Sequence, residues 1–111
     1  MQIFLYLLFI HLMKTIVKNS SIHGRGLFSA TEIKKGEHIG TFKGIPAKRN
    51  NKYILWLEKE KELVPYRIMN KMKYANHSEA PNAELDGLQM FATQKIVPGE
   101  EITFHYGSDW D

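Results

Sequence analysis

Residues 74 to 82 read Tyr-Ala-Asn-His-Ser-Glu-Ala-Pro-Asn, and this stretch decides how the chain is interpreted. Asn76, His77 and Ser78 stand in a row, with Pro81 and Asn82 shortly after, so several hydrogen-bond donors and acceptors gather in an otherwise apolar chain. By itself, the segment also has the composition of a hydrogen-bonded loop that ends in a turn. Its meaning therefore depends on the segments to either side.

Toward the C-terminus, residues 99 to 107 read Gly-Glu-Glu-Ile-Thr-Phe-His-Tyr-Gly. A strand here would place Ile102, Phe104 and Tyr106 on one face, because side chains alternate along a strand. The Tyr106 hydroxyl would then lie at the end of an apolar wall, which is useful geometry for an active site. A core strand with a tyrosine at its solvated end has the same pattern, so both interpretations remain open at this point.

Toward the N-terminus, residues 23 to 30 read His-Gly-Arg-Gly-Leu-Phe-Ser-Ala. Glycines at 24 and 26 allow a sharp turn and a close approach of the backbone to a ligand, because glycine has no Cβ. The segment lacks the third glycine and the following helix of a dinucleotide-binding site. Alone, it is equally an ordinary turn before a strand.

Short strands account for most of the chain from Lys14 onward. The runs are rich in β-branched and aromatic residues and are bounded by Gly, Pro, Asn and Asp, which is typical of β-structure. We expect strands at Thr15–Lys18, Gly26–Ala30, His38–Gly44, Tyr53–Leu57, Leu63–Ile68, Ala83–Leu85, Gln89–Ala92 and Glu101–Tyr106. The sequence therefore predicts a mostly β fold.

Between these strands, an isoleucine followed by a turn with Gly-Glu occurs twice, at Ile33 to Glu37 and at Ile96 to Glu100. The polar and basic stretch Lys43 to Lys52 is predicted to be a surface loop. Tyr66 to Lys73 is the best candidate for a helix.

The chain has 111 residues, which is room for one domain with one core. It contains no cysteine, which excludes disulfides, thiolate nucleophiles and cysteine-ligated zinc. None of its five histidines forms a pair at one-turn helical spacing, so we expect no metal site.

A net charge of +3 is a mild excess, and its dispersed basic residues predict no nucleic-acid groove. Residues 1–13 form an apolar extension, either an extra strand or helix or a segment upstream of a better start at Met13. This run is too short to span a bilayer as a helix, and no basic residue or cleavage site marks a signal peptide. We therefore expect a cytoplasmic protein without a membrane anchor.

In this order and spacing, the three segments resemble the motifs of the SET domain family of protein lysine methyltransferases. The stretch from Gly24 to Phe28 is similar to its first cofactor motif, the stretch from Asn76 to Asn82 to its most diagnostic motif, and Gly99 to Gly107 to its terminal tyrosine motif. The resemblance covers about Lys14 to Trp110, so residues 14–111 are expected to form the domain. It is greatest to the compact viral and bacterial members.

The resemblance implies a SET-domain (β-clip) fold of small β-sheets with short helical turns, in which the Asn-His and tyrosine segments meet in a pseudoknot. It also implies S-adenosylmethionine as the cofactor and Tyr106 as the catalytic residue. The implied cofactor-binding residues are Gly24, Arg25, Gly26, Leu27, Asn76 and His77. The substrate-lysine channel is expected to be lined by Tyr53, Tyr74, Phe104 and Trp110.

Phe104 stands where family members carry either Phe or Tyr, and by resemblance Phe leaves room for di- or trimethylation. His105 replaces a frequent Asp and is expected to point away from Tyr106. Without the zinc-binding cysteines of many relatives, the channel would be closed by residues 108–111 or by homodimerisation.

The expected substrate is a lysine-containing protein or peptide such as a histone tail, which would require a nuclear or host-directed location. Two rival hypotheses are a catalytically inactive SET-like peptide-binding module and a small basic β-barrel that binds nucleic acid.

Overall fold

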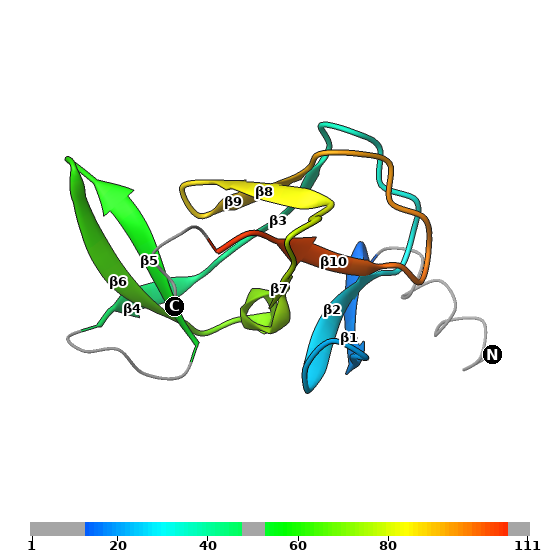
Figure 1. Ribbon diagram of the computed structural model, residues 1–111, viewed down its shortest axis with the longest axis horizontal. Helices are drawn as coiled ribbons and strands as arrows, with labels where there is room; N and C mark the ends of the chain where they lie inside the picture. The colour runs from blue at the N-terminus through cyan, green and yellow to red at the C-terminus, as the bar shows by residue number, and fades with distance from the viewer. Residues whose placement is uncertain (1–12, 48–52, 107–111) are drawn as a thin grey trace.

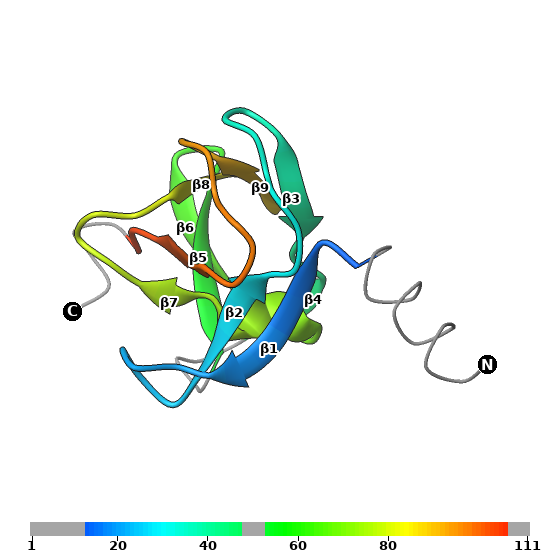
Figure 2. The ribbon, with the colours of Figure 1, turned by 90° about the vertical axis from the view of Figure 1, so that its right-hand side faces the viewer.

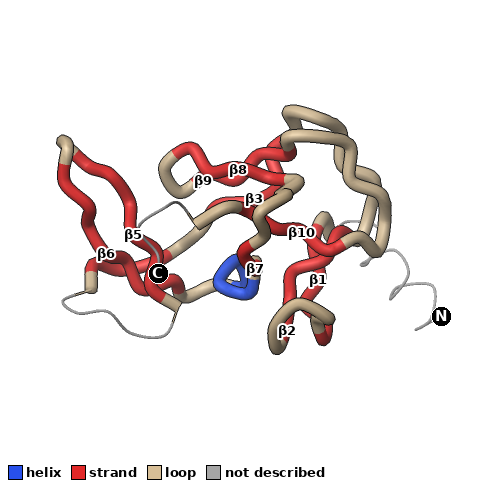
Figure 3. Tube along the Cα trace, in the orientation of Figure 1, coloured by secondary structure: helices blue, strands red, loops and turns tan. Residues whose placement is uncertain are grey.

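The computed structural model describes residues 13–47 and 53–106, and its regular structure is nearly all short strands joined by loops and turns (Figures 1 and 3). The elements are β1 (Thr15–Asn19), β2 (Arg25–Ser29), β3 (His38–Thr41), β4 (Gly44–Pro46), β5 (Ile54–Lys59), β6 (Glu62–Ile68), the 3₁₀ turn η1 (Lys71–Tyr74), β7 (Asn76–His77), β8 (Ala83–Asp86), β9 (Gln89–Ala92) and β10 (Glu101–Phe104). The predicted mostly β fold is confirmed.

The strands form three small sheets. One has four strands in the order β1-β2-β10-β7, and two have three strands each, in the orders β3-β9-β8 and β4-β6-β5. Figure 1 shows the β4-β6-β5 sheet at one end of the molecule and β1 and β2 toward the other, with η1 between them. The turned view in Figure 2 shows β3 and β9 on the side opposite β7. Strands distant in sequence, such as β2 and β10 or β3 and β9, therefore pair with each other.

The core is shared among the three sheets. Its buried apolar members are Leu27, Ile33, Ile39, Phe42, Ile68, Met72, Ala75, Ala83, Met90, Ala92, Ile96, Ile102 and Phe104. Leu27 and Ile102, which are 0% exposed, face each other in the β2–β10 register, and Phe104 follows on β10. The predicted motifs are therefore built on packed residues rather than on free loops.

The two predicted Ile-x-x-Gly-Glu turns are confirmed, and they pair with each other. Ile33 and Ile96 exchange backbone hydrogen bonds of 2.8 Å in each direction. Gly36 and Gly99 have φ values of 84° and 87°, a conformation that favours glycine. In each turn, the carboxylate of the final glutamate accepts the backbone N–H of the residue after the isoleucine at 3.0 Å. Identical local chemistry therefore shapes both turns.

The predicted helix at Tyr66–Lys73 is wrong over its first half. Tyr66 to Ile68 belong to β6, which pairs with β4 on one side and β5 on the other. Only Lys71–Tyr74 turns, as the 3₁₀ element η1. The strand predicted at Leu63–Ile68 is confirmed instead, and pairing on both edges holds these residues extended.

The predicted loop at Lys43–Lys52 is also wrong in part, because Gly44–Pro46 forms β4; residues 48–52 lie outside the described residues. A Cβ at Gly44 would lie 2.6 Å from the Arg67 carbonyl oxygen, so glycine permits this close approach to β6. The predicted strand His38–Gly44 is consequently divided between two sheets.

Within residues 13–47 and 53–106, no helix is long and apolar enough to cross a membrane. The apolar extension predicted at residues 1–13 lies outside the described residues, apart from Met13.

Candidate active site

The three sequence motifs lie side by side in the four-stranded sheet. The order β1-β2-β10-β7 places the tyrosine segment, on β10, between the first motif, on β2, and the Asn-His segment, on β7. β10 is antiparallel to β2 and parallel to β7, with Thr103 opposite Asn76 and Phe104 opposite His77. The meeting of these segments, expected from the resemblance, is confirmed.

The glycine turn, residues 23 to 26, uses its two glycines for different reasons. Gly24 has a φ of 46°, and a Cβ on it would meet nothing within 4 Å, so the turn is open on that side. A Cβ on Gly26 would collide with the Glu101 side chain, whose Cδ lies 2.9 Å away, and with Ser20. Gly26 therefore makes room for a carboxylate of this chain, whereas the sequence pattern suggested close approach to a ligand.

The Asn76 side chain holds the glycine turn by hydrogen bonds to its backbone carbonyls. Its side-chain amide lies 2.9 Å from the Glu101 carboxylate, 3.1 Å from the His23 carbonyl and 3.2 Å from both the Arg25 carbonyl and the Ser20 hydroxyl. The Ser20 hydroxyl in turn donates to Glu101 at 2.8 Å. Asn76 is 9% exposed, so its amide is committed to this network.

Sequence reasoning missed Ser20 and Glu101. Each is a common polar residue whose partner lies far away in the sequence, so the contact leaves no local pattern. Their role becomes visible only when β2, β7 and β10 are placed together.

Asn82 joins the end of the Asn-His segment to β10. Its side-chain oxygen accepts the Thr103 N–H at 2.9 Å, and its amide donates to the Glu101 carbonyl at 2.8 Å. Asn82 is 5% exposed. Strand β7 is too short to pair with all of β10, and the buried Asn82 side chain satisfies β10 backbone groups in its place.

Tyr106 lies just beyond the end of β10, so the predicted strand Glu101–Tyr106 ends two residues early, at Phe104. The Tyr106 hydroxyl donates to the Ala75 carbonyl at 3.3 Å, and its backbone N–H donates to His77 Nδ1 at 3.0 Å. Its ring lies 4.8 Å from the Phe104 ring, between centroids. Burial of the hydroxyl end raises the Tyr106 pKa above its usual value, so the group remains protonated at neutral pH.

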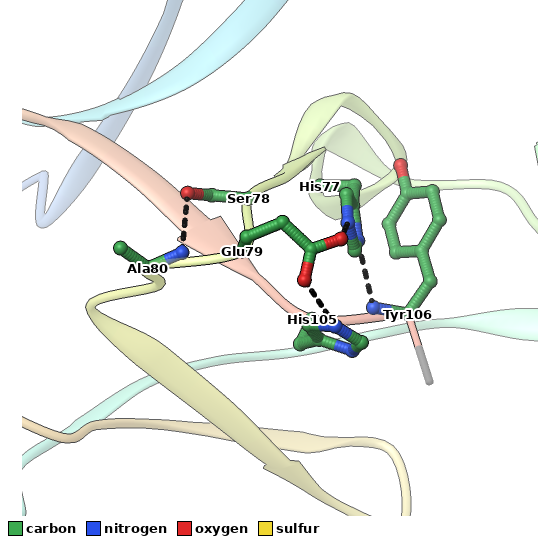
Figure 4. A network of polar contacts seen from close by, with 6 residues as sticks. All are labelled: His77, Ser78, Glu79, Ala80, His105 and Tyr106. Carbon is green, nitrogen blue, oxygen red and sulfur yellow. Dashed lines mark hydrogen bonds and ion pairs between the residues drawn. The ribbon is translucent and has the colours of Figure 1, made fainter. Parts of the chain in front are cut away.

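Beside Tyr106, Glu79 bridges two histidines, as Figure 4 shows. Its carboxylate oxygens lie 3.1 Å from His77 Nε2 and 3.0 Å from His105 Nε2. Hydrogen bonds from His77 and then His105 lower the Glu79 pKa. The ligand-type atoms of this cluster lie within 4.8 Å of one another, an arrangement that sequence spacing did not predict. The absence of a bound metal stays a prediction.

Two of the four residues predicted to line a lysine channel form an aromatic pair. The Tyr53 and Tyr74 rings are 5.7 Å apart and nearly perpendicular. The Lys73 ammonium lies 4.8 Å from the Tyr53 ring centroid and 5.2 Å from that of Tyr74. Phe104 is 4% exposed and contacts Tyr106 instead, whereas Trp110 lies outside the described residues.

Two of the residues predicted to bind a cofactor have side chains that are already committed within the protein. The Leu27 side chain is 0% exposed and belongs to the core, and the Asn76 amide is directed into the network below the turn. Gly24 is open on the side where a Cβ would stand, so a ligand could approach the backbone there.

The glycine turn, the Asn-His segment and Tyr106 are brought together by β2, β10 and β7, as the resemblance to the SET domain family implied. Residues 24–107 match the SET domain family model, and the chain belongs to this family.

Among its relatives, the chain is similar to the histone-lysine N-methyltransferase MEDEA of Arabidopsis thaliana, with 29% identity over 84% of this chain and 16% of that protein. It is also similar to the histone-lysine N-methyltransferase EZ1 of Zea mays, with 26% identity over 84% of this chain and 12% of that protein. The chain thus spans a small part of either relative.

Two solved structures share the fold. The methyltransferase domain of human PR domain-containing protein 2 matches with a TM-score of 0.69 and 20% identity, over 89% of this chain and 80% of that domain. Polycomb repressive complex 2 of Chaetomium thermophilum, solved bound to S-adenosylmethionine, matches with a TM-score of 0.72 and 21% identity, over 87% of this chain and 15% of that one.

Proposed function

We propose that the chain is an S-adenosylmethionine-dependent protein-lysine N-methyltransferase. The observation that supports this best is the single sheet in which β2, β10 and β7 bring the glycine turn, Tyr106 and the Asn-His segment together. Membership of the SET domain family supports the same activity. A structural neighbour solved with S-adenosylmethionine supports the choice of cofactor.

In this proposal, the cofactor lies against the glycine turn and the Asn-His segment. The residues that hold it are Gly24, Arg25, Gly26, Leu27, Asn76 and His77, with Leu27 and Asn76 contributing backbone groups. When bound, S-adenosylmethionine supplies a methyl group activated by a positively charged sulfur. The chain's task is to present a neutral amine in line with that group.

Deprotonation is the first requirement, because a lysine of pKa about 10.4 needs about 4.6 kcal/mol to become neutral at pH 7. Apolar surroundings and a nearby positive charge lower that requirement, so the proposal needs no separate general base. Tyr106 then orients the amine. While its O–H donates to the Ala75 carbonyl, its oxygen can accept the amine N–H and leave the nitrogen lone pair directed at the methyl group.

The aromatic pair of Tyr53 and Tyr74 supports the proposed lysine channel. A lysine ammonium of this chain, that of Lys73, already lies over the Tyr53 and Tyr74 rings. Aromatic faces attract such cations, and the attraction strengthens as water is excluded. We therefore retain Tyr53 and Tyr74 as channel residues, together with Phe104 and Trp110.

The proposed substrate is a basic protein segment that contains lysine. The relatives are named histone-lysine methyltransferases, which makes a histone tail the first candidate, and such a substrate would place the protein in a nucleus. Homodimerisation remains a proposal for closing the channel.

The test is calorimetric titration of the full chain with S-adenosylmethionine, followed by incubation with lysine peptides that include histone tails. Cofactor binding with methyl transfer to lysine is expected. Binding of cofactor and peptide without transfer would instead indicate the inactive SET-like module. A folded chain that binds neither would overturn the proposal.

The degree of methylation depends, in this proposal, on Phe104. Its buried ring lies between Tyr106, at 4.8 Å, and Phe42, at 5.9 Å between centroids, so a hydroxyl on it would enter the space beside the reacting amine. We expect wild type to add two or three methyl groups and Phe104→Tyr to stop at one, as measured by mass spectrometry of the peptide product under excess cofactor.

Phe91→Tyr is the matched control. Phe91, on β9, packs against His38 of β3, with ring centroids 5.4 Å apart. The same added oxygen there should leave the product distribution unchanged. Wild type that stops at one methyl group would contradict the assignment of Phe104.

A further inference from the structure

The cluster of His77, Glu79 and His105 lies directly against Tyr106 (Figure 4). The His77 and His105 ring centroids are 4.7 Å apart, and the His77 ring centroid is 5.0 Å from that of Tyr106. The side chains are 15%, 80% and 40% exposed for His77, Glu79 and His105, respectively. The histidine nearest Tyr106 is therefore also the most enclosed.

The contacts of His77 define its tautomer. Tyr106 donates its backbone N–H to Nδ1, so Nδ1 must carry a lone pair. In a neutral ring the proton then resides on Nε2, the atom that faces Glu79 at 3.1 Å. The Glu79 carboxylate, ionised at neutral pH, accepts this proton's hydrogen bond and stabilises the tautomer that Tyr106 requires.

His105 holds the carboxylate from its other side. Its Nε2 lies 3.0 Å from the second oxygen of Glu79, and an ionised carboxylate can only accept, so Nε2–H of His105 donates. Each carboxylate oxygen therefore has a histidine partner. This restrains an otherwise exposed side chain in the orientation that His77 needs.

A transition metal would accept the same donor set of two imidazoles and one carboxylate. A metal ion on His77 Nε2 would, however, require a lone pair there and a proton on Nδ1. That proton would face the Tyr106 N–H and break the 3.0 Å bond. The described geometry therefore favours a chain of hydrogen bonds over a metal centre.

The backbone of Tyr106 needs such a restraint because β10 ends at Phe104. Strand pairing with β7 extends to Phe104 and His77, and the contact that follows it is the bond from the Tyr106 N–H to the His77 ring. This bond therefore fixes the backbone of Tyr106, which lies beyond the last paired residue of β10.

We propose that Glu79 and His105 are positioning residues that hold the Tyr106 backbone in place through the tautomer of His77. The inference rests on the proposed role of Tyr106 in methyl transfer. It assigns no substrate contact to Glu79 or His105, and it adds residues that the motif comparison left without a role.

The experiment compares wild type with Glu79→Ala, Glu79→Gln and His105→Ala by ¹⁵N NMR of the imidazole nitrogens and by steady-state kinetics. Wild-type His77 should show the tautomer protonated at Nε2. Glu79→Ala should give mixed tautomers and lower kcat roughly tenfold, the size expected for a lost positioning partner, with KM for S-adenosylmethionine little changed. Glu79→Gln should recover most of the activity, because its amide oxygen can still accept from His77.

Glu84→Ala is the control, since Glu84 is an exposed glutamate of β8 away from the cluster. Unchanged His77 tautomer and kcat in Glu79→Ala would overturn the inference. So would tight Zn²⁺ binding that shifts the Nε2 resonances of both histidines, together with loss of wild-type activity in EDTA. The NMR comparison decides the hydrogen-bond chain even if wild type transfers no methyl group, so failure of the proposed function is distinguishable.

Discussion

Replacing Tyr106 with phenylalanine is expected to lower kcat for methyl transfer by about 10²- to 10³-fold, the loss typical of removing one group that orients or stabilises the transition state. The substitution deletes only the hydroxyl. The bond from its backbone N–H to His77 and the ring contact with Phe104 remain available to the variant. Cofactor affinity and the melting temperature should therefore stay close to wild type.

The measurement is single-turnover transfer to a lysine peptide, with calorimetry to verify cofactor binding. Tyr66→Phe is the matched control, because Tyr66 packs against the core from β6, and losing its hydroxyl should leave transfer unchanged. If Tyr106→Phe kept more than about a tenth of wild-type kcat, the hydroxyl could not be the main orienting group.

Sequence reasoning succeeded where the deciding forces are local. Strand boundaries such as those at Gln89–Ala92 agree with the structure, because alternation and turn residues lie within the segment itself. The paired turns containing Gly36 and Gly99 were predictable for the same reason, since positive φ favours glycine. Tyr66 to Ile68 fell within both a predicted strand and a predicted helix, and pairing with β4 and β5 on both edges decides in favour of the strand.

The candidate site was predictable only in part. The motifs suggested which residues matter, and family resemblance implied that the Asn-His and tyrosine segments meet. Their parallel pairing as β7 and β10 was not predicted, since no local pattern specifies it. Ser20 and Glu101 meet across 81 positions of the chain, a distance over which single-sequence patterns carry no information. The interpretation of Gly26 changed for the same reason: its neighbour is Glu101.

The role of His105, which stands where family members often carry Asp, could not be inferred from its position in the sequence. Alternation along a strand predicted that it points away from Tyr106, yet β10 ends before this residue, and its ring bonds to Glu79 beside Tyr106. The departure from the family pattern at His105 is explained by its hydrogen bond to Glu79. Neither has an evident purpose until the fold brings them to 3.0 Å.

Asn76→Ala is expected to weaken S-adenosylmethionine binding about a hundredfold and to destabilise the domain. Its amide serves the Glu101 carboxylate and the His23 and Arg25 carbonyls, and each of these partly buried hydrogen bonds stabilises the turn by about 0.5–1.5 kcal/mol. The glycine turn would then be ordered in few molecules. If one molecule in about a hundred is competent, apparent affinity falls about a hundredfold, because binding must first select the ordered state.

Asn70→Ala is the matched control, since Asn70 also bridges backbone groups, from Thr41 at 2.8 Å and Lys43 at 3.3 Å, but away from the glycine turn. It should lower the melting temperature and keep cofactor binding. Asn76→Asp tests the cause more strictly, because it would place a second carboxylate where the amide now lies 2.9 Å from Glu101. Repulsion between the two should make this variant less stable than Asn76→Ala at neutral pH and partly restore it in acid, where one carboxylate is protonated. Thermal denaturation across pH measures this order, and an Asn76→Asp variant as stable as wild type at neutral pH would show that the amide does not hold the turn.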